Sequence, residues 1–427
     1  MSSRIWGVRA VAAALFIAGG VASCTAGGAE SSGGDDEVTL TFLTFETPNL
    51  TAEYWDDVIE RTSEQVPGVT IEKLVAPSAE QRNEYVRQLD STGELPDVMV
   101  AIDPGGLAEA GKLAEFSEDE LADWIDPTAN SFDGAIYQLA TNSQTWQIYY
   151  NKAAFQTAGI DQPPTTWDEL LADVAALEQA GITPFVIGGG APDGLGPRWT
   201  FAQLMATEVY AEDPQWLAKL VAGEVDFSDP LFVDAATKMQ ALASAARVDN
   251  LSATYAEAQD AFLNGEGAMY PMGSWFPAAP DETQQQEIGV FSMPTDDGSL
   301  VLPAYTGGGL SVSASAEDVD LAKQWAIEFS RVNADGGARF DGLFVALDGY
   351  EPPSDLPLLY NETLGLLDSA QAEGTVTTSF GNEGGTPALP PGFIAEVDAA
   401  LLDLLNGRAD VDSFVATLNQ KLTDLER

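Results

Sequence analysis

The chain has 427 residues, 45% of them hydrophobic, which is more than one compact core normally holds and predicts two lobes. It carries 67 acidic and 18 basic residues, a net charge of −49, so it should repel nucleic acid and anionic membrane surfaces. Histidine is absent, which excludes histidine-dependent nucleophile systems and most zinc sites. The acidity suits a salt-rich habitat or a general acidic bias of the host, and both readings stay open.

The first residues resemble an export signal that ends at a lipidated cysteine. Arg4 and Arg9 form a short positive region before an apolar run over residues 10–20, which at about eleven residues is too short to span a bilayer. The run ends in Val-Ala-Ser-Cys24, which resembles the lipobox of lipoprotein signal peptidase, and no second cysteine exists to form a disulfide. We expect residues 1–23 to be a signal peptide and Cys24 to anchor the chain to the outer face of the cell membrane. An ordinary signal peptide with an incidental cysteine is the alternative.

After the cysteine, strand and helix patterns alternate. Residues 24–37 are rich in glycine, serine and acid, so they predict a flexible tether, and the folded body should begin near Val38. We predict strands at 38–46, 69–74 and 96–101, and helices at 51–65 and from 78 to about 92, the latter opened by a capping box of Ser78 and Gln81. This order implies a parallel sheet with helices on both faces.

The second region repeats the pattern. We predict strands at 146–150 and 184–187, with a helix between them that begins at a capping box of Thr166 and Glu169 and ends at Gly181. Residues 199–270 have a mainly helical pattern, apart from a strand-like stretch at 268–271. A further strand at 309–313 and helices at 318–332, 393–405 and 411–425 complete the chain.

Four stretches carry patterns that are weak alone but specific in their order. They are Leu95–Val98 with Asp103 beyond it, Ile148–Ile160 followed by Pro163–Leu170, Phe262–Met269 with Gly273–Trp275, and Phe291–Pro294 with Tyr305–Ser313. In this order the chain resembles the extracellular solute-binding protein family that includes maltose- and other oligosaccharide-binding proteins, over nearly all of residues 38–427. The resemblance implies an α/β fold of the type II periplasmic-binding-protein kind. Each of its two lobes would be a mostly parallel sheet flanked by helices, with the ligand cleft between the lobes.

The resemblance also implies boundaries and partners. The N-terminal lobe would comprise residues 38–145 plus 309–345 and the C-terminal lobe residues 146–308 plus 346–427. The chain would cross between them near Asn142–Trp146, Thr306–Leu310 and Val345–Asp348. Such a protein captures a carbohydrate, here expected to be an oligosaccharide, by hinge closure and delivers it to the permease subunits of an ABC importer. We expect a monomer with no cofactor, no metal and no enzymatic activity.

A sugar has hydroxyl groups at its edges and apolar faces, so a matching site combines aromatic rings with carboxylates and carboxamides. Trp275 is the first candidate because it matches the aromatic residue of the family's Gly-Ser-Trp-like motif; a core position is the alternative. Asp103 and Glu46 follow strands, at the end where open α/β sheets bind ligands, although Asp103 could be a turn cap. The remaining candidates are Trp146 and Gln144 at the first crossing, Trp199, Asn49 (or a helix cap), Tyr305 and Gly308 at the second crossing, and Phe380, Asn382 and Glu383 in a glycine-rich loop.

Two other functions stay open at this point. The same fold could bind a polyamine or another cation, which the acidic charge favours, whereas the tryptophans and carboxamides favour sugar. An extracellular glycoside hydrolase needs only two carboxylates, and 67 acidic residues could supply them almost anywhere. The negative charge disfavours an anionic ligand. Asp296-Asp297-Gly298 does not continue into an EF-hand pattern, so no metal site is predicted.

Overall fold

The computed structural model describes residues 38–79, 81–129, 131–132, 134–191, 194–243, 245, 248–381, 389–390 and 392–425. These residues belong to the second of two units of the chain, which runs from Glu37 to Arg427. The predicted signal peptide and tether, Cys24, Asn382 and Glu383 lie outside the described residues. Within the described part of the chain, no helix has the length and apolar character needed to cross a bilayer.

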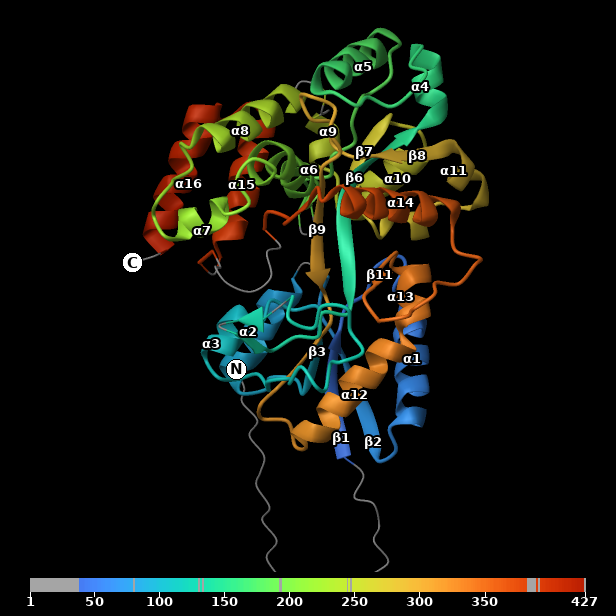
Figure 1. The fold of residues 1–427 in the computed structure, drawn as a ribbon, viewed down its shortest axis with the longest axis vertical. Coiled ribbons are helices and arrows are strands. Elements are labelled where there is room, and N and C mark those ends of the chain that lie inside the picture. The colour runs from blue at the N-terminus through green and yellow to red at the C-terminus, as the bar shows by residue number, and fades with distance from the viewer. Residues whose placement is uncertain are drawn as a thin grey trace, which may run out of the picture. The chain divides into compact units, whose positions relative to one another are not determined.

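A four-stranded sheet lies at the centre of the first lobe, whose main core is drawn from residues 40–139 and 310–329 (Figure 1). In spatial order its strands are β10 (Leu310–Val312), β3 (Val98–Val100), β1 (Val38–Thr44) and β2 (Val69–Val75). β1 pairs in parallel with β2 and β3, and β10 pairs antiparallel with β3. The parallel β-α-β-α-β unit predicted for this region is therefore confirmed.

Alternation along β1 explains why helices cover both faces of this sheet. Phe42 packs in one core with Trp55 and Trp325, whereas its neighbour Leu43 packs in another with Val86. Successive side chains of a strand point to opposite faces, and both Phe42 and Leu43 are fully buried, so both faces are covered. The covering helices are α1 (Ala52–Gln65) and α12 (Val319–Val332) on the first face, and α2 (Arg82–Thr92) and α3 (Gly105–Glu109) on the second; α13 (Ala334–Phe340) packs beside α12.

A six-stranded sheet forms the centre of the second lobe, and β6 (Asn142–Asn151) is its principal strand. It pairs antiparallel with β7 (Met269–Gly273), β8 (Ile288–Phe291), β9 (Leu302–Gly307) and β11 (Phe344–Val345), while β12 (Val376–Thr377) pairs in parallel with β9. The expectation of a mostly parallel sheet is wrong for this lobe. β6 leaves the first lobe and β9 returns to it, so the two strands run in opposite directions where they pair.

Helices surround the second sheet (Figure 1). They are α4 (Lys152–Ala158), α5 (Trp167–Gln179), α6 (Gly196–Met205), α7 (Trp216–Val221), α8 (Pro230–Ala243), α9 (Val248–Leu251), α10 (Tyr255–Leu263), α11 (Glu282–Glu287), α14 (Leu358–Glu373), α15 (Phe393–Leu405) and α16 (Val411–Leu425). A π-helical turn (Ala206–Tyr210) extends α6, a short 3-10 helix (Phe276–Ala278) follows β7, and β4 (Ser131–Phe132) pairs with β5 (Ala135–Ile136) in the first lobe. The residue boundaries predicted for the lobes stay a prediction.

The ends of the elements test the sequence patterns. The capping box that opens α5 is confirmed, because Thr166 and Glu169 each accept a hydrogen bond from the other's backbone N–H. The box predicted at Ser78 is wrong: Ser78 accepts from the Gln81 N–H, but the Gln81 side chain makes no cap and the helix begins at Arg82. The strand predicted at 184–187 is also wrong. It forms only a bridge from Phe185 to β7, since proline at its start lacks an N–H and a glycine run follows it.

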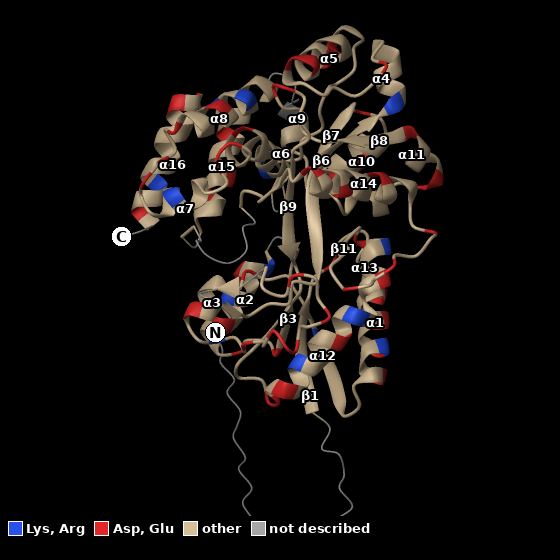
Figure 2. Cartoon of the chain, in the orientation of Figure 1, with Lys and Arg blue, Asp and Glu red and all other residues tan. Residues whose placement is uncertain are grey.

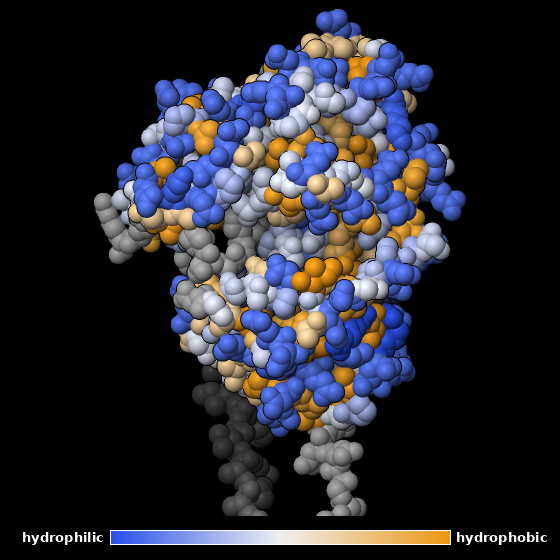
Figure 3. Space-filling view, in the orientation of Figure 1, coloured by the Kyte–Doolittle hydropathy of each residue, from blue (hydrophilic) through white to orange (hydrophobic). Residues whose placement is uncertain are grey.

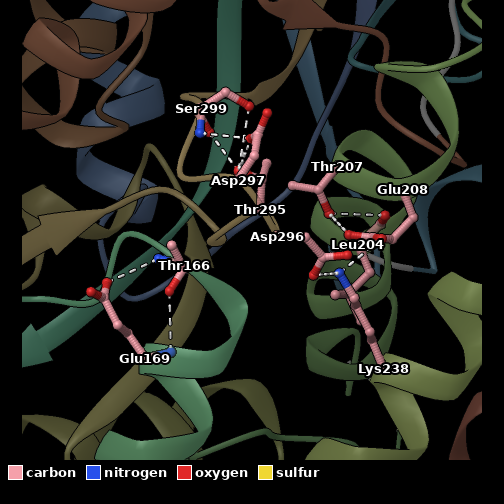
Figure 4. Close-up of polar contacts among 10 residues, drawn as sticks. All are labelled: Thr166, Glu169, Leu204, Thr207, Glu208, Lys238, Thr295, Asp296, Asp297 and Ser299. Atoms are coloured by element: carbon pink, nitrogen blue, oxygen red, sulfur yellow. Dashed lines mark hydrogen bonds and ion pairs between the residues drawn. The ribbon is translucent and has the colours of Figure 1, made fainter.

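A largely buried lysine side chain joins separate elements of the second lobe (Figure 4). The Lys238 ammonium of α8 lies 2.8 Å from the Glu208 carboxylate of the π-helical turn and 2.7 Å from Asp296 in the loop before β9. It also lies 5.0 Å from the centre of the Trp167 ring of α5. The side chains of Lys238 and Glu208 are each only 11% exposed, so this ion pair is largely removed from water.

Acidic residues outnumber basic residues over the whole chain. Figure 2 shows Asp and Glu positions along the helices of both lobes with few Lys and Arg positions between them, in keeping with the net charge of −49. The face drawn in Figure 3 is mainly hydrophilic with scattered apolar patches. Among the described residues, Ile125 is the large apolar side chain with the greatest exposure, at 68%. Carboxylates at this density repel one another, and added salt screens that repulsion.

Candidate ligand-binding cleft

A cleft of about 680 Å³ lies between the two lobes, a size typical of pockets for small molecules. The first lobe contributes the loop after β1, the start of α2 and the turn after β3. The second lobe contributes the start of α6, Trp275 and part of α15. Residues of β6 and β9, the strands that connect the lobes, also line it. The cleft therefore opens where movement of the lobes would change its width.

Aromatic rings line the second-lobe side of the cleft. The Trp275 ring makes edge-to-face contacts with Trp146, at 6.2 Å between ring centres, and with Trp199, at 5.3 Å. Tyr255 meets Trp199 in the same manner at 5.9 Å. Trp146 and Trp199 are buried, whereas Trp275 is partly exposed to the cleft. We call these four residues the aromatic wall. The partly exposed Trp275 ring would cover an apolar face of a ligand, and the buried rings of Trp146 and Trp199 support it from behind.

Two close glycine contacts fix the position of Trp275. A Cβ atom at Gly273 would lie 2.1 Å from the Trp275 ring, so the ring packs directly on the backbone there. Gly342, with a φ of +55°, comes so close from the segment before β11 that a Cβ would lie 2.7 Å from the Trp275 Cα. The contact at Gly273 explains why the Gly-Ser-Trp motif needs glycine in its first position.

Buried polar atoms without a hydrogen-bond partner gather at this cleft. Among the described residues they include the indole N–H of Trp146 and the amide oxygen of Asn142. Arg198 Nε and Asp398 Oδ1 lie 3.3 Å apart, close enough for an ion pair but not aligned for a hydrogen bond. Buried polar groups are normally paired. A cleft with both unpaired hydrogen-bond donors and unpaired acceptors is suited to a ligand whose groups both accept and donate hydrogen bonds.

The charges that line the cleft balance, unlike those of the whole chain. The charged residues among its described lining are Arg82, Arg87, Arg198, Asp103, Asp341 and Asp398. Three are cationic and three are carboxylic, in a chain with 18 basic and 67 acidic residues. Burial raises the pKa of Asp398, against the lowering effect of Arg198, and raises the pKa of Asp341 to about 7, against the lowering effect of Arg82. The described lining of the cleft therefore has no excess of negative charge at pH 7.

The predicted carboxylates have different positions. Asp103 lines the cleft, and its Oδ1 accepts a hydrogen bond from the Gly105 N–H at 3.0 Å, so it is also the turn cap considered as its alternative. Just before it, Ala101 has a φ of +49°, a conformation that side chains other than glycine rarely adopt and that often marks functional sites. Glu46 is exposed and is not part of the lining. Asn49 lines the cleft and does not cap α1, because Thr51 makes that cap.

The predicted residues on the connecting strands all line the cleft. Gln144 and Tyr305 lie opposite each other on β6 and β9. Gly308 has a φ of +67° where β9 leads back to the first sheet, and its N–H donates to the Tyr305 hydroxyl at 3.3 Å. A Cβ at Gly309 would lie 2.0 Å from the Leu139 carbonyl oxygen, so the two connections touch through their backbones.

Of the described residues predicted to contact a ligand, eight line the cleft: Trp275, Asp103, Trp146, Trp199, Gln144, Asn49, Tyr305 and Gly308. Phe380 does not, because it is fully buried in the second-lobe core, 5.9 Å from the Phe201 ring. Five charged residues of the lining were not predicted from the sequence: Arg82, Arg87, Arg198, Asp341 and Asp398. Only Arg198 had a local signal, its position beside Trp199. No cluster of three or more metal-ligating side chains occurs among the described residues.

Comparison with known proteins agrees with this arrangement. Residues 47–329 match the family model described as bacterial extracellular solute-binding protein. An uncharacterized ABC transporter extracellular-binding protein from Pyrococcus horikoshii is 23% identical over 289 residues, which make up 65% of this chain and 60% of that protein. The chain therefore matches less than two thirds of that relative's length.

Two solved structures show the fold. A chitin oligosaccharide binding protein superposes with a TM-score of 0.79 at 22% identity, covering 91% of this chain and 99% of the other. Maltose-bound MalE3 of T. maritima superposes with a TM-score of 0.70 at 18% identity, covering 91% and 100%. The two-lobed α/β fold of type II periplasmic binding proteins is thereby confirmed. Because the family model matches well over half of its length, this chain belongs to the bacterial extracellular solute-binding protein family.

Proposed function

We propose that this protein captures a carbohydrate, an oligosaccharide by preference, in the cleft between its lobes and delivers it to the permease of an ABC importer. The observation that carries the proposal is the combination of the aromatic wall with unpaired buried donors and acceptors in a cleft of balanced charge. Sugar hydroxyls both donate and accept, and sugar rings have apolar faces for indole rings. The chitin oligosaccharide and maltose proteins with the same fold support this class of ligand.

The balance of charge separates sugar from the alternatives. A polyamine would enter a cleft whose six described charged residues are three arginines and three aspartates, so the lining would give it no net electrostatic attraction. The acidic surface that favoured a cation in the sequence does not extend to the described lining of the cleft. A glycoside hydrolase needs a positioned pair of carboxylates, and nothing in the family or in the matched structures supports one. We therefore infer binding without hydrolysis.

Thermal melts against a panel of sugars test this function. Maltose and chitin oligosaccharides should be tested beside spermidine and inorganic phosphate. A ligand that binds only the folded state raises Tm. At a free ligand concentration of one hundred times Kd, it adds about 2.7 kcal/mol to the free energy of unfolding. A rise with one sugar and none with spermidine is expected. A rise with spermidine alone would contradict the proposal, and release of reducing ends from chitin oligosaccharides would show an enzyme instead.

Trp275 provides the mutational test of the aromatic wall. Trp275→Ala should remove the sugar-induced rise in Tm while the unliganded protein still melts cooperatively, because the ring is partly exposed to the cleft. Trp275→Phe keeps a ring and should retain part of the response. Ile125→Ala, at an exposed apolar side chain outside the cleft lining, is the matched control and should leave the response unchanged. An alanine variant at position 275 that keeps the full response would exclude the aromatic wall as the binding surface.

Attachment to the membrane is a separate part of the proposal. We infer that the chain is exported and carries a lipid on Cys24, with the predicted lobes 38–145 plus 309–345 and 146–308 plus 346–427 acting as a monomer. An acyl anchor would hold an acidic protein near a membrane whose anionic surface repels it. Cys24→Ser should move the protein from the membrane fraction to the soluble fraction and abolish labelling by palmitate, whereas Ser23→Ala should change neither.

A further inference from the structure

Asp341 is a cleft residue that the family motifs do not mark. It lies in the turn between α13 and β11 and lines the cleft. Its backbone N–H donates to the Gly337 carbonyl at 3.0 Å, which fixes the turn at the end of α13. No hydrogen-bond donor among the described residues reaches its carboxylate.

Groups on the packed elements surround this carboxylate. Tyr54 of α1 faces it, but the Tyr54 hydroxyl donates to Asn333. Arg82 of α2 also faces it, and the Arg82 guanidinium lies 4.4 Å from the centre of the Phe45 ring. Burial outweighs the attraction of Arg82, because the pKa of Asp341 is raised to about 7. The unliganded fold therefore holds a carboxylate that lacks sufficient polar partners.

The aromatic wall begins one residue further along the chain. Gly342 packs so closely that a Cβ there would lie 2.3 Å from the Ser274 carbonyl oxygen and 2.7 Å from the Trp275 Cα. Because Asp341 precedes Gly342, its backbone is fixed beside the residue that would stack on a sugar. The side chains of Asp341 and Arg82 line the same cleft as the Trp275 ring.

We propose that Asp341 contacts the captured carbohydrate and, together with Arg82, selects adjacent hydroxyl groups on it. The inference rests on the proposed carbohydrate-binding function. The carboxylate accepts hydrogen bonds from hydroxyl groups, and the guanidinium donates to hydroxyl oxygens. An amine would satisfy Asp341 but be repelled by Arg82, and a carboxylate or phosphate would do the reverse. A hydroxyl group satisfies both side chains, because it donates and accepts.

Such a role explains why the fold retains a carboxylate here. Asp341 is partly buried, and a carboxylate that is partly removed from water without a donor destabilises the unliganded protein; a neutral residue of similar size would avoid that cost. Residues at binding sites often lower the stability of the unliganded protein, and the bound ligand restores that stability. A residue kept for structure would have the opposite signature, because its replacement would destabilise the unliganded protein.

The test compares Asp341→Asn with wild type in the full chain. Asparagine has nearly the same shape but no charge, and Asp348→Asn, at an exposed carboxylate outside the cleft lining, is the matched control. Titration calorimetry with maltose and chitin oligosaccharides at pH 8 should show roughly tenfold or greater loss of affinity for Asp341→Asn and no change for Asp348→Asn. The unliganded Tm of Asp341→Asn at pH 8 should equal or exceed that of wild type.

Two results would overturn the inference. One is an affinity of Asp341→Asn within twofold of wild type for the sugar that binds. The other is a lower unliganded Tm, which would assign Asp341 a structural role. If neither sugar binds the wild-type protein, the proposed function fails on these probes, and the melts of the unliganded proteins alone decide the role of Asp341. A higher Tm for Asp341→Asn than for wild type supports a carboxylate retained for a binding partner. A lower Tm for the variant contradicts it.

Discussion

Replacement of Asp341 by asparagine should remove one component of the pH dependence of folding. The ordinary pKa of this carboxyl group is 3.8, and burial raises it to about 7 in the fold. Between these values the folded state binds more protons than the unfolded state, so the free energy of unfolding falls as pH rises. The stability that the protonated group contributes is complete below pH 4 and is lost once pH exceeds about 7.

The size of the effect follows from the pKa difference. Each pKa unit corresponds to 1.36 kcal/mol, so a change from 3.8 to about 7 corresponds to about 4 kcal/mol as an upper value. Asparagine cannot ionise, so the free energy of unfolding contributed by its uncharged side chain is the same at every pH. The variant and the wild type should therefore have nearly equal stability near pH 4, and the variant should be more stable by up to this amount at pH 8.

Urea unfolding followed by circular dichroism at several pH values from 4 to 8 measures the difference directly. The two stability curves should separate progressively up to about pH 7 and run parallel above it. The effects of all other carboxylates cancel, because both proteins contain them. A constant offset across this range, or a less stable variant at pH 8, would show that the carboxylate is well solvated or has a donor, and would refute the reasoning from burial.

Three further perturbations test other parts of the structure. Lys238→Ala leaves buried Glu208 without its cation and should lower the free energy of unfolding by about 3 kcal/mol, whereas Lys421→Ala, in an exposed ion pair, should lower it by less than about 1 kcal/mol. Equal losses in urea unfolding would contradict the burial of the first pair. Gly309→Ala places a Cβ 2.0 Å from a carbonyl oxygen and should lower Tm, whereas Gly365→Ala, exposed on α14 with nothing within 4 Å, should raise stability by about 0.5–1 kcal/mol. A Gly309→Ala variant as stable as wild type would disprove the close backbone contact. Because the net charge is −49, raising sodium chloride from low to molar concentration should raise Tm, and a constant Tm would show that surface repulsion is unimportant.

The periodicity of apolar residues correctly predicted helices that each bury a single apolar stripe. The bounds of α15 and α16 agree with the helical periodicity, because each helix buries one apolar stripe that includes Val397, Leu401 and Leu418. The strand predicted at 184–187 failed because an apolar run becomes a strand only where a neighbour offers a full row of hydrogen bonds. The antiparallel second sheet also depends on the return path of β9, which no local pattern specifies.

The site was predictable where a motif or a strand end marked it. Trp275 and Asp103 were found in this way, and both line the cleft. Asp341 had no such mark, since one aspartate among 67 acidic residues is distinguished only by the fold that buries it near Arg82. Phe380 shows the reverse error: an aromatic residue in a glycine-rich loop has the same local pattern whether it faces a cleft or, as here, a core.

The contacts within the aromatic wall give the protein an intrinsic optical reporter. Three of its nine tryptophans, Trp146, Trp199 and Trp275, form one chain of edge-to-face contacts at 6.2 and 5.3 Å, so excitation passes readily among them. A solute that displaces water from Trp275 should shift the fluorescence of the whole group. Trp55 lines the first-lobe side of the cleft, and the other described tryptophans lie outside the lining and give a constant background. Replacing those background tryptophans by phenylalanine would convert the protein into a label-free fluorescent sensor for its own ligand.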